Sequence, residues 1–371
     1  MMRVVEKQMA VPASGLHVHC AHKHYRSRRK VLSVPSSPLL QQYMSVAQRS
    51  YNSRHTQRFA TSSISEPIDV PDNVVKLSQA IQDITMQGEH RGMTELQAHL
   101  SPSYITDSAL FLLEQLPPHA KVGITTGFYI LSAGAPETDG PPGAAAVAYA
   151  LQALGHEVVF ITDKCSEAVV RSISSSHQVL IFPMLPSGEA AEEAALKECA
   201  ALRLDALISV ERAGILADGT YRNMHQADMS AFNAPIDLIF AEMEGTTVGI
   251  GDGGNEIGMG KLFEHIPVAC PSKLPQRASI TSTTHLIVAT TSNWGAYGLA
   301  TALSVLSGRD LLISPPTGRQ LVRKCLEAGA VDGVTGKAEE SVDGMPLEDG
   351  ELPILTQLHA CVMDFRNRGF D

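Results

Sequence analysis

The residues best placed to do chemistry in this sequence lie in a glycine-rich segment near residue 250. A β-branched run at residues 246–250 is typical of a buried strand. After it, Asp252, Asn255 and Glu256 stand among five glycines: Gly251, Gly253, Gly254, Gly258 and Gly260. Because glycine lacks a Cβ atom, the backbone there can approach a ligand closely, while the acidic and amide side chains supply hydrogen-bonding atoms. We therefore predict a small-ligand site in this loop; a tight strand-to-helix connection is the alternative.

Three more clusters of polar residues follow predicted strands. The strand at residues 122–126 leads to two acids, the strand at 206–210 to a Glu-Arg pair, and the strand at 285–289 to a Ser-Asn-Trp sequence. The carboxyl ends of parallel strands meet at one edge of a sheet, where ligands bind beside helix N-termini. We therefore expect the glycine loop to share one site with Thr126, Glu137, Asp139, Glu211, Arg212, Ser292, Asn293 and Trp294.

Each cluster also has a purely structural interpretation. Acids just before a helix stabilise its N-terminus, an adjacent Glu-Arg pair can form an internal salt bridge, and Trp294 can simply pack in the core. The turn at residues 218–223, which ends at Asn223, is either an ordinary surface hairpin or part of the site.

Strands alternate with helices from residue 121 onward. Apolar runs predict strands at residues 122–126, 157–162, 179–182, 206–210, 246–250 and 285–289. Helical patterns occur at residues 142–154, 167–175, 189–202, 236–243, 294–306, 318–328 and 352–365, with a hairpin or flap at 331–349. Strands separated by helices imply an α/β fold with a mostly parallel sheet and helices on both faces. This Rossmann-like three-layer arrangement places its ligand site at the strand carboxyl ends.

Three segments of the chain differ in composition. Residues 1–60 contain ten Lys and Arg, one acid and many serines, which is typical of a mitochondrial transit peptide. A basic tail that stays attached or binds nucleic acid is the alternative. Residues 61–120 are predicted to form an N-terminal helical extension with a helix at 104–116, and residues 121–371 an α/β domain. We therefore expect a protein of the mitochondrial matrix.

The charge and hydropathy of the sequence argue against some partners. Residues 61–371 hold 19 basic and 38 acidic side chains, so a nucleic acid would be repelled. No apolar run approaches the roughly 18 residues that cross a bilayer, so we expect no membrane partner. The six cysteines are scattered without metal-ligand spacing. The composition is compatible with a small anionic substrate and with a homo-oligomer.

Gathering the acids at one edge would bring up to five carboxylates together. Like charges raise one another's pKa unless a cation joins them. Oxygen ligands without histidine or cysteine suit Mg²⁺, Mn²⁺ or Ca²⁺ rather than zinc, and we expect Mg²⁺ or Mn²⁺, with Asp139, Asp252 and Glu256 as candidate ligands. Alternatively, nearby arginine and lysine side chains neutralise the acids. The sequence establishes no cofactor, and a divalent cation is the one that it suggests.

Six motifs lie in order between about residues 100 and 360: Glu137-Thr-Asp-Gly-Pro-Pro-Gly-Ala144, Glu211-Arg-Ala-Gly214, Ala217-Asp-Gly-x-Tyr-x-Asn223, Gly249-x-Gly-Asp-Gly-Gly-Asn-Glu-Ile-Gly-Met-Gly-Lys261, Ser292-Asn-Trp-Gly295 and Val331-Asp-Gly-Val-Thr-Gly336. Together they resemble the C-terminal domain of the D-glutamate cyclase family. The resemblance implies a hydro-lyase that converts D-glutamate into 5-oxo-D-proline and water in mitochondria. It also leads us to expect that the N-terminal hydro-lyase-like domain of the larger animal enzymes is absent.

The cyclisation that this resemblance implies needs a base, a cation and an acid. We assign the base to Asp252 or Glu256 and the neutralisation of the γ-carboxylate to Arg212 or a bound metal. Glu137 or Asp139 is then the acid or a metal ligand. We expect the backbone N–H groups of Gly253 and Gly254 to stabilise the oxyanion. We expect Asn255 and Asn293 to orient the α-carboxylate of the substrate. The remaining site residues are Glu211, among the catalytic groups, and, for substrate binding, Thr126, Asn223, Gly253, Gly254, Asn255, Ser292, Asn293 and Trp294.

Two other classes of function fit parts of the sequence. The segment Gly251-Asp-Gly-Gly-Asn-Glu256 is similar to the magnesium loop of haloacid-dehalogenase-type phosphatases, which makes a metal-dependent phosphatase-like hydrolase the enzymatic alternative. Such enzymes also carry an Asp-x-Asp sequence after an early strand, and the nearest candidates here lack the paired aspartates. The other alternative is a non-catalytic subunit that binds a small ligand in the same cleft.

Overall fold

The computed structural model describes residues 72–174, 177–184, 189–243, 246–269 and 278–368. By its internal contacts the chain divides into two compact units, Met1–Pro35 and Ser36–Asp371, and every described residue belongs to the second. The transit peptide predicted at residues 1–60 therefore lies outside the described residues.

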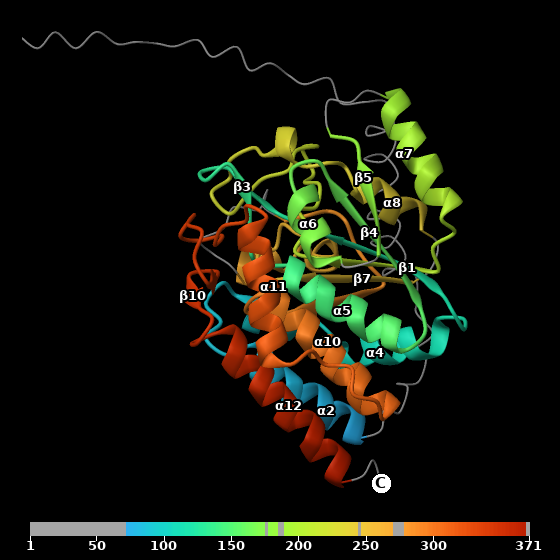
Figure 1. Cartoon of the computed structure of the whole chain (residues 1–371), viewed down its shortest axis with the longest axis vertical. Coiled ribbons are helices and arrows are strands. Elements are labelled where there is room, and N and C mark those ends of the chain that lie inside the picture. Colours follow the sequence, from blue (N-terminus) through green and yellow to red (C-terminus); the bar gives the residue numbers. More distant parts are fainter. Residues whose placement is uncertain (1–71, 175–176, 185–188, 244–245, 270–277, 369–371) are drawn as a thin grey trace, which may run out of the picture. The chain divides into compact units, whose positions relative to one another are not determined.

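A six-stranded parallel sheet forms the centre of the second unit (Figure 1). Every neighbouring pair of its strands is parallel. The strands, in spatial order, are β5 (Gln178–Phe182), β4 (Glu157–Asp163), β1 (Lys121–Thr126), β6 (Ala206–Val210), β7 (Thr246–Gly251) and β8 (His285–Val288). The direction of winding reverses between β1 and β6, as in doubly wound folds. In such folds the ligand crevice opens at the strand carboxyl ends where this reversal occurs.

The apolar strand sequences explain why the sheet is buried on both faces. All five residues of β6 are buried, as are the residues of β1 and β4 after the first. Side chains alternate between two hydrophobic clusters: Ile124 and Phe160 lie in one, and Val159 and Ile161 lie in the other. Continuous apolar runs of this kind are typical of parallel strands covered on both sides. The predicted α/β fold class is therefore confirmed.

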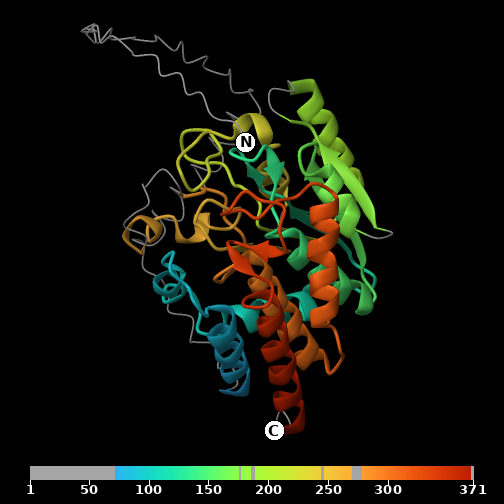
Figure 2. The same cartoon turned by 60° about the vertical axis from the view of Figure 1, so that its left-hand side comes forward.

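Helices cover both faces of the sheet (Figures 1 and 2). One face carries α5 (Pro141–Ala153), α6 (Glu167–Ile173) and α10 (Ser292–Ser307), whose apolar residues join the larger cluster. The same cluster includes residues of α11 (Pro315–Glu327) and α12 (Glu351–Arg368). The opposite face carries α7 (Glu189–Ala201) and α8 (Asp237–Glu242). These helices lie where the periodicity of the sequence predicts them, within a few residues at each end.

Several shorter elements lie between the strands and helices of the three layers. They are α3 (Met93–Gln97), α9 (Ile266–Ala269), the 3-10 helices η1 (Ser230–Phe232) and η2 (Gly260–Leu262), and the strand pairs β2–β3 (Tyr129–Ile130 with Ala135–Pro136) and β9–β10 (Ser341–Val342 with Met345–Pro346). The β9–β10 pair is the hairpin expected within residues 331–349. The β2–β3 pair is not predicted by the sequence pattern, because strands of two residues are too short to show a period.

Two helices that precede the first strand of the sheet belong to the same core. Ile81 of α2 (Asp72–Thr85) and Ile105 of α4 (Tyr104–Gln115) are fully buried in the larger cluster. The hydroxyl of Tyr104 donates a hydrogen bond to the carbonyl oxygen of Val288 in β8, at 3.0 Å. The described part of the expected helical extension therefore packs directly against the α/β layers. Of the described helices, none combines the length and the apolar character that a bilayer span requires.

The N-termini of α5 and α10 point to the edge of the sheet where the strands end. Thr291 caps α10 by accepting the N–H of Trp294 through Oγ1, at 3.3 Å, and Gly308, with a φ of 67°, ends that helix. α5 begins with Pro141 and Pro142, whose fixed φ suits the first turn of a helix. Two helix N-termini therefore reach the same edge as the glycine loop.

Candidate functional site

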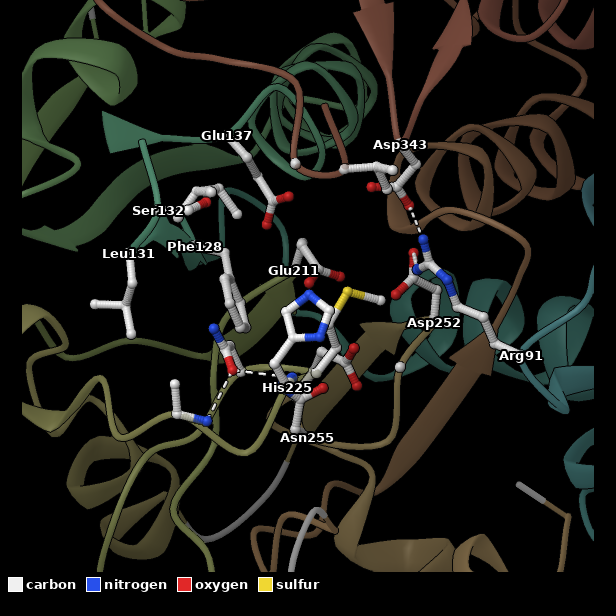
Figure 3. A pocket seen from close by; sticks show the side chains of 18 residues that line it. Arg91, Phe128, Leu131, Ser132, Glu137, Glu211, His225, Asp252, Asn255 and Asp343 are labelled. Carbon is white, nitrogen blue, oxygen red and sulfur yellow. Dashed lines mark hydrogen bonds and ion pairs between the residues drawn. The ribbon is translucent and has the colours of Figure 1, made fainter. Parts of the chain in front are cut away.

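A cavity of about 320 Å³ opens at the carboxyl-terminal edge of the sheet (Figure 3). Its wall combines five acidic side chains with an arginine and a group of apolar side chains. The acids are Glu137, Glu211, Asp252, Glu256 and Asp343, and the other lining residues are Arg91, Phe128, Ile130, Leu131, Ser132, Asn223, Met224, His225, Ala227, Gly253, Asn255, Gly333 and Val334. Small-molecule sites have volumes of about 300–1,000 Å³. The cavity is therefore at the small end of that range and suits a small ligand.

Loops from both sides of the strand-order reversal form this cavity. Glu137 follows β1 and the short β3, Glu211 follows β6, and Asp252 and Glu256 follow β7. The loop at 292–295 lies behind the wall, since Ser292 Oγ donates to Glu211 Oε2 at 2.5 Å. The four loops singled out in the sequence thus meet at one edge of the sheet.

The residues predicted for the site divide into those that line the cavity and those behind its wall. Glu137, Glu211, Asn223, Asp252, Gly253, Asn255 and Glu256 line it. The remaining residues of the prediction are not among the lining residues: Thr126, Asp139, Arg212, Gly254, Ser292, Asn293 and Trp294.

Glu211 occupies an unusual backbone conformation at the end of β6. Its φ of 46° is in the left-handed region, which non-glycine residues adopt at a cost and which is concentrated at functional sites. Burial and the neighbouring acids, Asp252 foremost, raise the pKa of Glu211 well above its ordinary value. Glu211 is therefore a carboxyl group that tends to keep its proton unless a cation approaches.

Asp139 links the N-termini of α5 and α10. Its carboxylate accepts the backbone N–H groups of Ser292 and Asn293, each at 2.9 Å, and that of Gly140 at 3.0 Å. Burial and the nearby acids, first Asp343, raise the pKa of Asp139. Three backbone donors at helix N-termini make it a structural support of the wall.

Asn293 and Trp294 also support the wall from behind. Asn293 Oδ1 accepts the N–H groups of Gly140 and Gly143, at 3.0 and 2.7 Å. The indole Nε1 of Trp294 donates to Glu351 Oε1 at 3.2 Å. Both side chains are buried, so they hold α5, α10 and α12 together rather than facing the cavity.

The glycine loop is shaped by its own side chains. Glu256 Oε2 accepts the N–H of Gly254 at 2.7 Å, and Gly254 has a φ of 91° that favours glycine. Asn255 Nδ2 donates to the carbonyl oxygen of Arg222 at 2.8 Å. The loop therefore presents Asp252, Gly253 and Asn255 to the cavity while it is fastened to a neighbouring loop.

The arginine predicted to neutralise the substrate's γ-carboxylate has a different place. Arg212 is buried in an ion pair with Asp163, and its guanidinium also donates to the carbonyl oxygens of Gly127 and Ala234, at 2.9 and 3.1 Å. Its side chain is 1% exposed and does not line the cavity. Arg212 thus holds the ends of β4 and β6 together, on the far side of the wall from a ligand.

Arg91 is the basic side chain among the described residues that line the cavity, and it lies in none of the sequence motifs. It lies between α2 and α3, and its guanidinium contacts Asp252 at 2.8 Å and Asp343 at 2.7 Å. The Asp252 carboxylate, followed by Asp343, raises the pKa of Arg91 further above its already high value. Arg91 therefore stays charged and joins loops from opposite ends of the described chain.

Asp343 is a second site residue that the sequence analysis missed. It forms the two-residue turn of the β9–β10 hairpin with Gly344, and both have positive φ, 53° and 79°. Burial raises the pKa of Asp343 to about 7, against the opposing effect of the Arg91 guanidinium. An Asp-Gly pair between two short apolar runs is a recognised hairpin signal, and it was available in the sequence.

Glu137 depends on a glycine beside it. Burial and then the Asp343 and Asp139 carboxylates raise the pKa of Glu137 well above its ordinary value. A Cβ atom added to Gly333 would overlap Oε2 of Glu137. The Val331-Asp-Gly sequence motif therefore leaves the space that this carboxyl group occupies.

Two groups of carboxylates are close enough to share an ion. One oxygen from each of Asp139, Asp252 and Asp343 lies within 4.8 Å of the others, and the same holds for Glu211, Asp252 and Glu256. In the first group, Arg91 already contacts Asp252 and Asp343. In the second group, all three carboxylates line the cavity. An all-oxygen ligand set fits Mg²⁺ or Mn²⁺. The second group is therefore the better candidate for a metal site. The ligands predicted from the sequence, Asp139, Asp252 and Glu256, combine members of the two groups.

Comparisons with known proteins agree with the motifs. A family model described as "D-glutamate cyclase-like, C-terminal" matches residues 81–359, a span that includes every residue lining the cavity. The human protein named "D-glutamate cyclase, mitochondrial" is 36% identical over 214 residues, which cover 51% of this chain and 33% of the human protein. The alignment thus spans about a third of that relative. With three quarters of its length matched by the family model, the chain belongs to the D-glutamate cyclase-like C-terminal domain family.

Proposed function

We propose that this protein converts D-glutamate into 5-oxo-D-proline and water by intramolecular cyclisation. Membership of the family and the name of the human relative support the reaction, although that relative is matched over part of its length. The observation that carries the proposal is the small cavity lined by acids and by Arg91, which lies entirely within the matched residues. A compact ligand with charged ends is the kind that such a wall can hold.

The proposed reaction moves two protons from nitrogen to oxygen. The α-ammonium group of the substrate becomes a lactam nitrogen with one hydrogen, and one γ-oxygen leaves as water. Atoms and charge balance without any co-reactant. The site must therefore take protons from the nitrogen and supply protons to the departing oxygen.

Glu137 is suited to protonate the departing oxygen. It lines the cavity, and its raised pKa keeps it protonated at a pH where an ordinary glutamate is ionised. A buried carboxyl group of this kind is a general acid.

In Figure 3, Arg91, Asp252 and Asp343 lie together on another side of the cavity. There, Arg91 offsets part of the negative charge that a dicarboxylic substrate brings.

We infer that a divalent cation, Mg²⁺ or Mn²⁺, is held by Glu211, Asp252 and Glu256. The proposed substrate brings two carboxylates into a cavity whose described lining includes five acids and one arginine. A bound cation would supply positive charge and polarise the γ-carboxylate. Titration of the protein with Mn²⁺, followed by electron paramagnetic resonance, tests this directly: Asp252→Asn should weaken binding, and unchanged binding contradicts the assignment.

The activity is tested with the purified full chain and with D- and L-glutamate as separate substrates. We expect 5-oxo-D-proline from D-glutamate, detected by chiral chromatography with mass spectrometry, and less product after chelation of divalent cations. Asp252→Asn and Glu211→Gln should each abolish most of the activity. Glu157→Gln, which alters a partly exposed ion pair with Lys121 at the amino-terminal ends of β1 and β4, is the matched control. Full activity in both site variants would rule out the proposed site.

We also propose that the protein acts in mitochondria. The basic, acid-poor composition of residues 1–60 and the name of the human relative support this location. Import of the full chain into isolated mitochondria should be followed by protection from external protease. A chain that stays sensitive to protease would contradict the proposal.

A further inference from the structure

The proposed cyclisation needs a base for the first proton, and the acids considered for this task are already engaged. Asp252 Oδ2 contacts the Arg91 guanidinium at 2.8 Å. Glu256 Oε2 accepts the N–H of Gly254 at 2.7 Å. Proton transfer to either carboxylate would have to compete with a contact that the structure already shows. Another group in the cavity wall is therefore better suited to deprotonate the α-ammonium group.

His225 is the histidine among the described residues that line the cavity. In the view of Figure 3 its imidazole projects into the cavity between Phe128 and Asp252. His225 is exposed, so it lies at the mouth of the cavity. A ring nitrogen of histidine can accept a proton and return it within one reaction cycle.

The loop that carries His225 is held in place before any ligand binds. Asn223 Oδ1 accepts the backbone N–H groups of His225 and Ala227, both at 3.0 Å. The N–H of Gln226 donates to the carbonyl oxygen of Asn223 at 3.0 Å, and Arg222 Nη1 donates to that of Gln226 at 3.1 Å. Fixed backbone beneath a reactive side chain favours catalysis, because less freedom is lost when the substrate is positioned.

The same loop is fastened to the glycine loop that carries the acids. Asn255 Nδ2 donates to the carbonyl oxygen of Arg222 at 2.8 Å, and Asn255 itself lines the cavity. The histidine and the acid cluster are therefore parts of one connected wall. Proton acceptor and proton donor can then act on the same small substrate.

We propose that His225 is the general base of the cyclisation and that Asn223 is its positioning residue. This inference rests on the proposed function. The imidazole takes one proton from the α-ammonium group, and the amine lone pair then forms the bond to the γ-carbon. Glu137 gives its proton to one γ-oxygen and recovers a proton from the nitrogen. The imidazolium gives its proton to the same oxygen, which leaves as water when the C–O bond breaks, so both residues return to their starting states.

Steady-state kinetics of the full chain test the role of His225. His225→Ala and His225→Gln should lower kcat by about 100-fold or more, the range of general base catalysis, with little change in KM. Imidazole added to the buffer should restore part of the kcat of His225→Ala. The matched control is His119→Asn, because His119 is an exposed histidine before β1, at the other edge of the sheet, with a φ of 60° that asparagine tolerates.

Asn223 is tested by a pair of variants. Asn223→Ala removes the acceptor of two backbone N–H groups and should lower kcat more than it raises KM. Asn223→Asp keeps an oxygen acceptor and should restore most of kcat. Equal losses in both variants would contradict a positioning role.

The outcomes separate this inference from the proposed function. If the wild-type chain forms no 5-oxoproline, the proposed function fails. If the wild type is active and His225→Ala is equally active, the role of His225 alone fails. A loss of kcat in His225→Ala that imidazole does not restore would make His225 a structural residue and would also overturn the inference.

Discussion

At the scale of the residue, Glu351 shows how burial controls charge behind the cavity. Its side chain is almost fully buried at the start of α12 and accepts the indole N–H of Trp294. Burial raises the pKa of Glu351 to about 7, against the opposing effect of its hydrogen bonds. Since the folded-state pKa lies above the ordinary value of 4.5, ionisation of Glu351 destabilises the fold.

Glu351→Gln should therefore stabilise the protein in a pH-dependent way. Below about pH 4.5 the carboxyl group is neutral in both the folded and the unfolded chain, so the variant and the wild type should have the same free energy of unfolding. The gain grows as pH rises to about 7 and is then constant, at most roughly 3 kcal/mol. Urea denaturation of both proteins between pH 5 and pH 8 measures it, and a difference in unfolding free energy that does not change with pH would contradict the assignment.

Gly333→Ala should damage the site without unfolding the protein. The added methyl group would overlap the carboxylate end of Glu137, a flexible side chain that can rotate away. Displacement of a catalytic group by about 1 Å can lower activity on the order of 100-fold. Gly350→Ala is the control, because its added methyl group would have no neighbour closer than 3.4 Å. Normal kcat in Gly333→Ala, with an unchanged melting temperature, would show that Glu137 does not act in the reaction.

At the scale of the element, the β9–β10 hairpin completes the cavity with a charged turn. Asp332 holds the hairpin in position. Its carboxylate accepts hydrogen bonds from the hydroxyl of Ser341 at 2.6 Å and from the N–H of Gly344 at 2.8 Å. The hairpin thereby presents Asp343 to Arg91 in the loop between α2 and α3. One ion pair joins two elements that are far apart in the sequence.

A double-mutant cycle should measure this connection. Arg91→Met and Asp343→Asn are expected to show a coupling energy of unfolding of about 1 kcal/mol or more, because both side chains are largely buried. The more exposed pair of Arg319 and Glu348, changed to Met and Gln, is the control and should show a much smaller coupling energy, because solvent screens its charges. Additive effects of the two site substitutions would show that the hairpin and the loop are independent.

The sequence predicts the elements of this fold better than it predicts the members of the site. The strands and most helices follow from local periodicity, and the glycine loop follows from composition. Arg212 lies in a sequence motif, and the motif predicts that its side chain contacts the ligand. In the structure, Arg212 forms an ion pair with Asp163 on the far side of the cavity wall. Arg91 reaches the cavity through a packing arrangement of distant segments, and no local pattern encodes that arrangement.

At the scale of the whole molecule, the helices before the sheet and the helix after it share one core. Ile81 in α2 and Leu355 in α12 are fully buried in the same cluster as the strands. We therefore expect Ile81→Ala to lower the unfolding free energy of the entire described unit by about 2–5 kcal/mol. Val268→Ala, at a side chain that is 80% exposed, is the control. A separate early transition for the N-terminal helices, seen by hydrogen exchange, would contradict a shared core.

The contact between Arg91 and Asp343 also bears on when the cavity forms during synthesis. A chain leaves the ribosome from its N-terminus, and folding of its first segments begins before the last ones emerge. A nascent chain that has emerged only through β8 carries Arg91, Glu211 and Asp252 but not yet the hairpin that supplies Asp343. A truncated chain that ends before the hairpin therefore lacks both Asp343 and the buried helix α12. It should show neither turnover nor the cooperative unfolding of the complete chain.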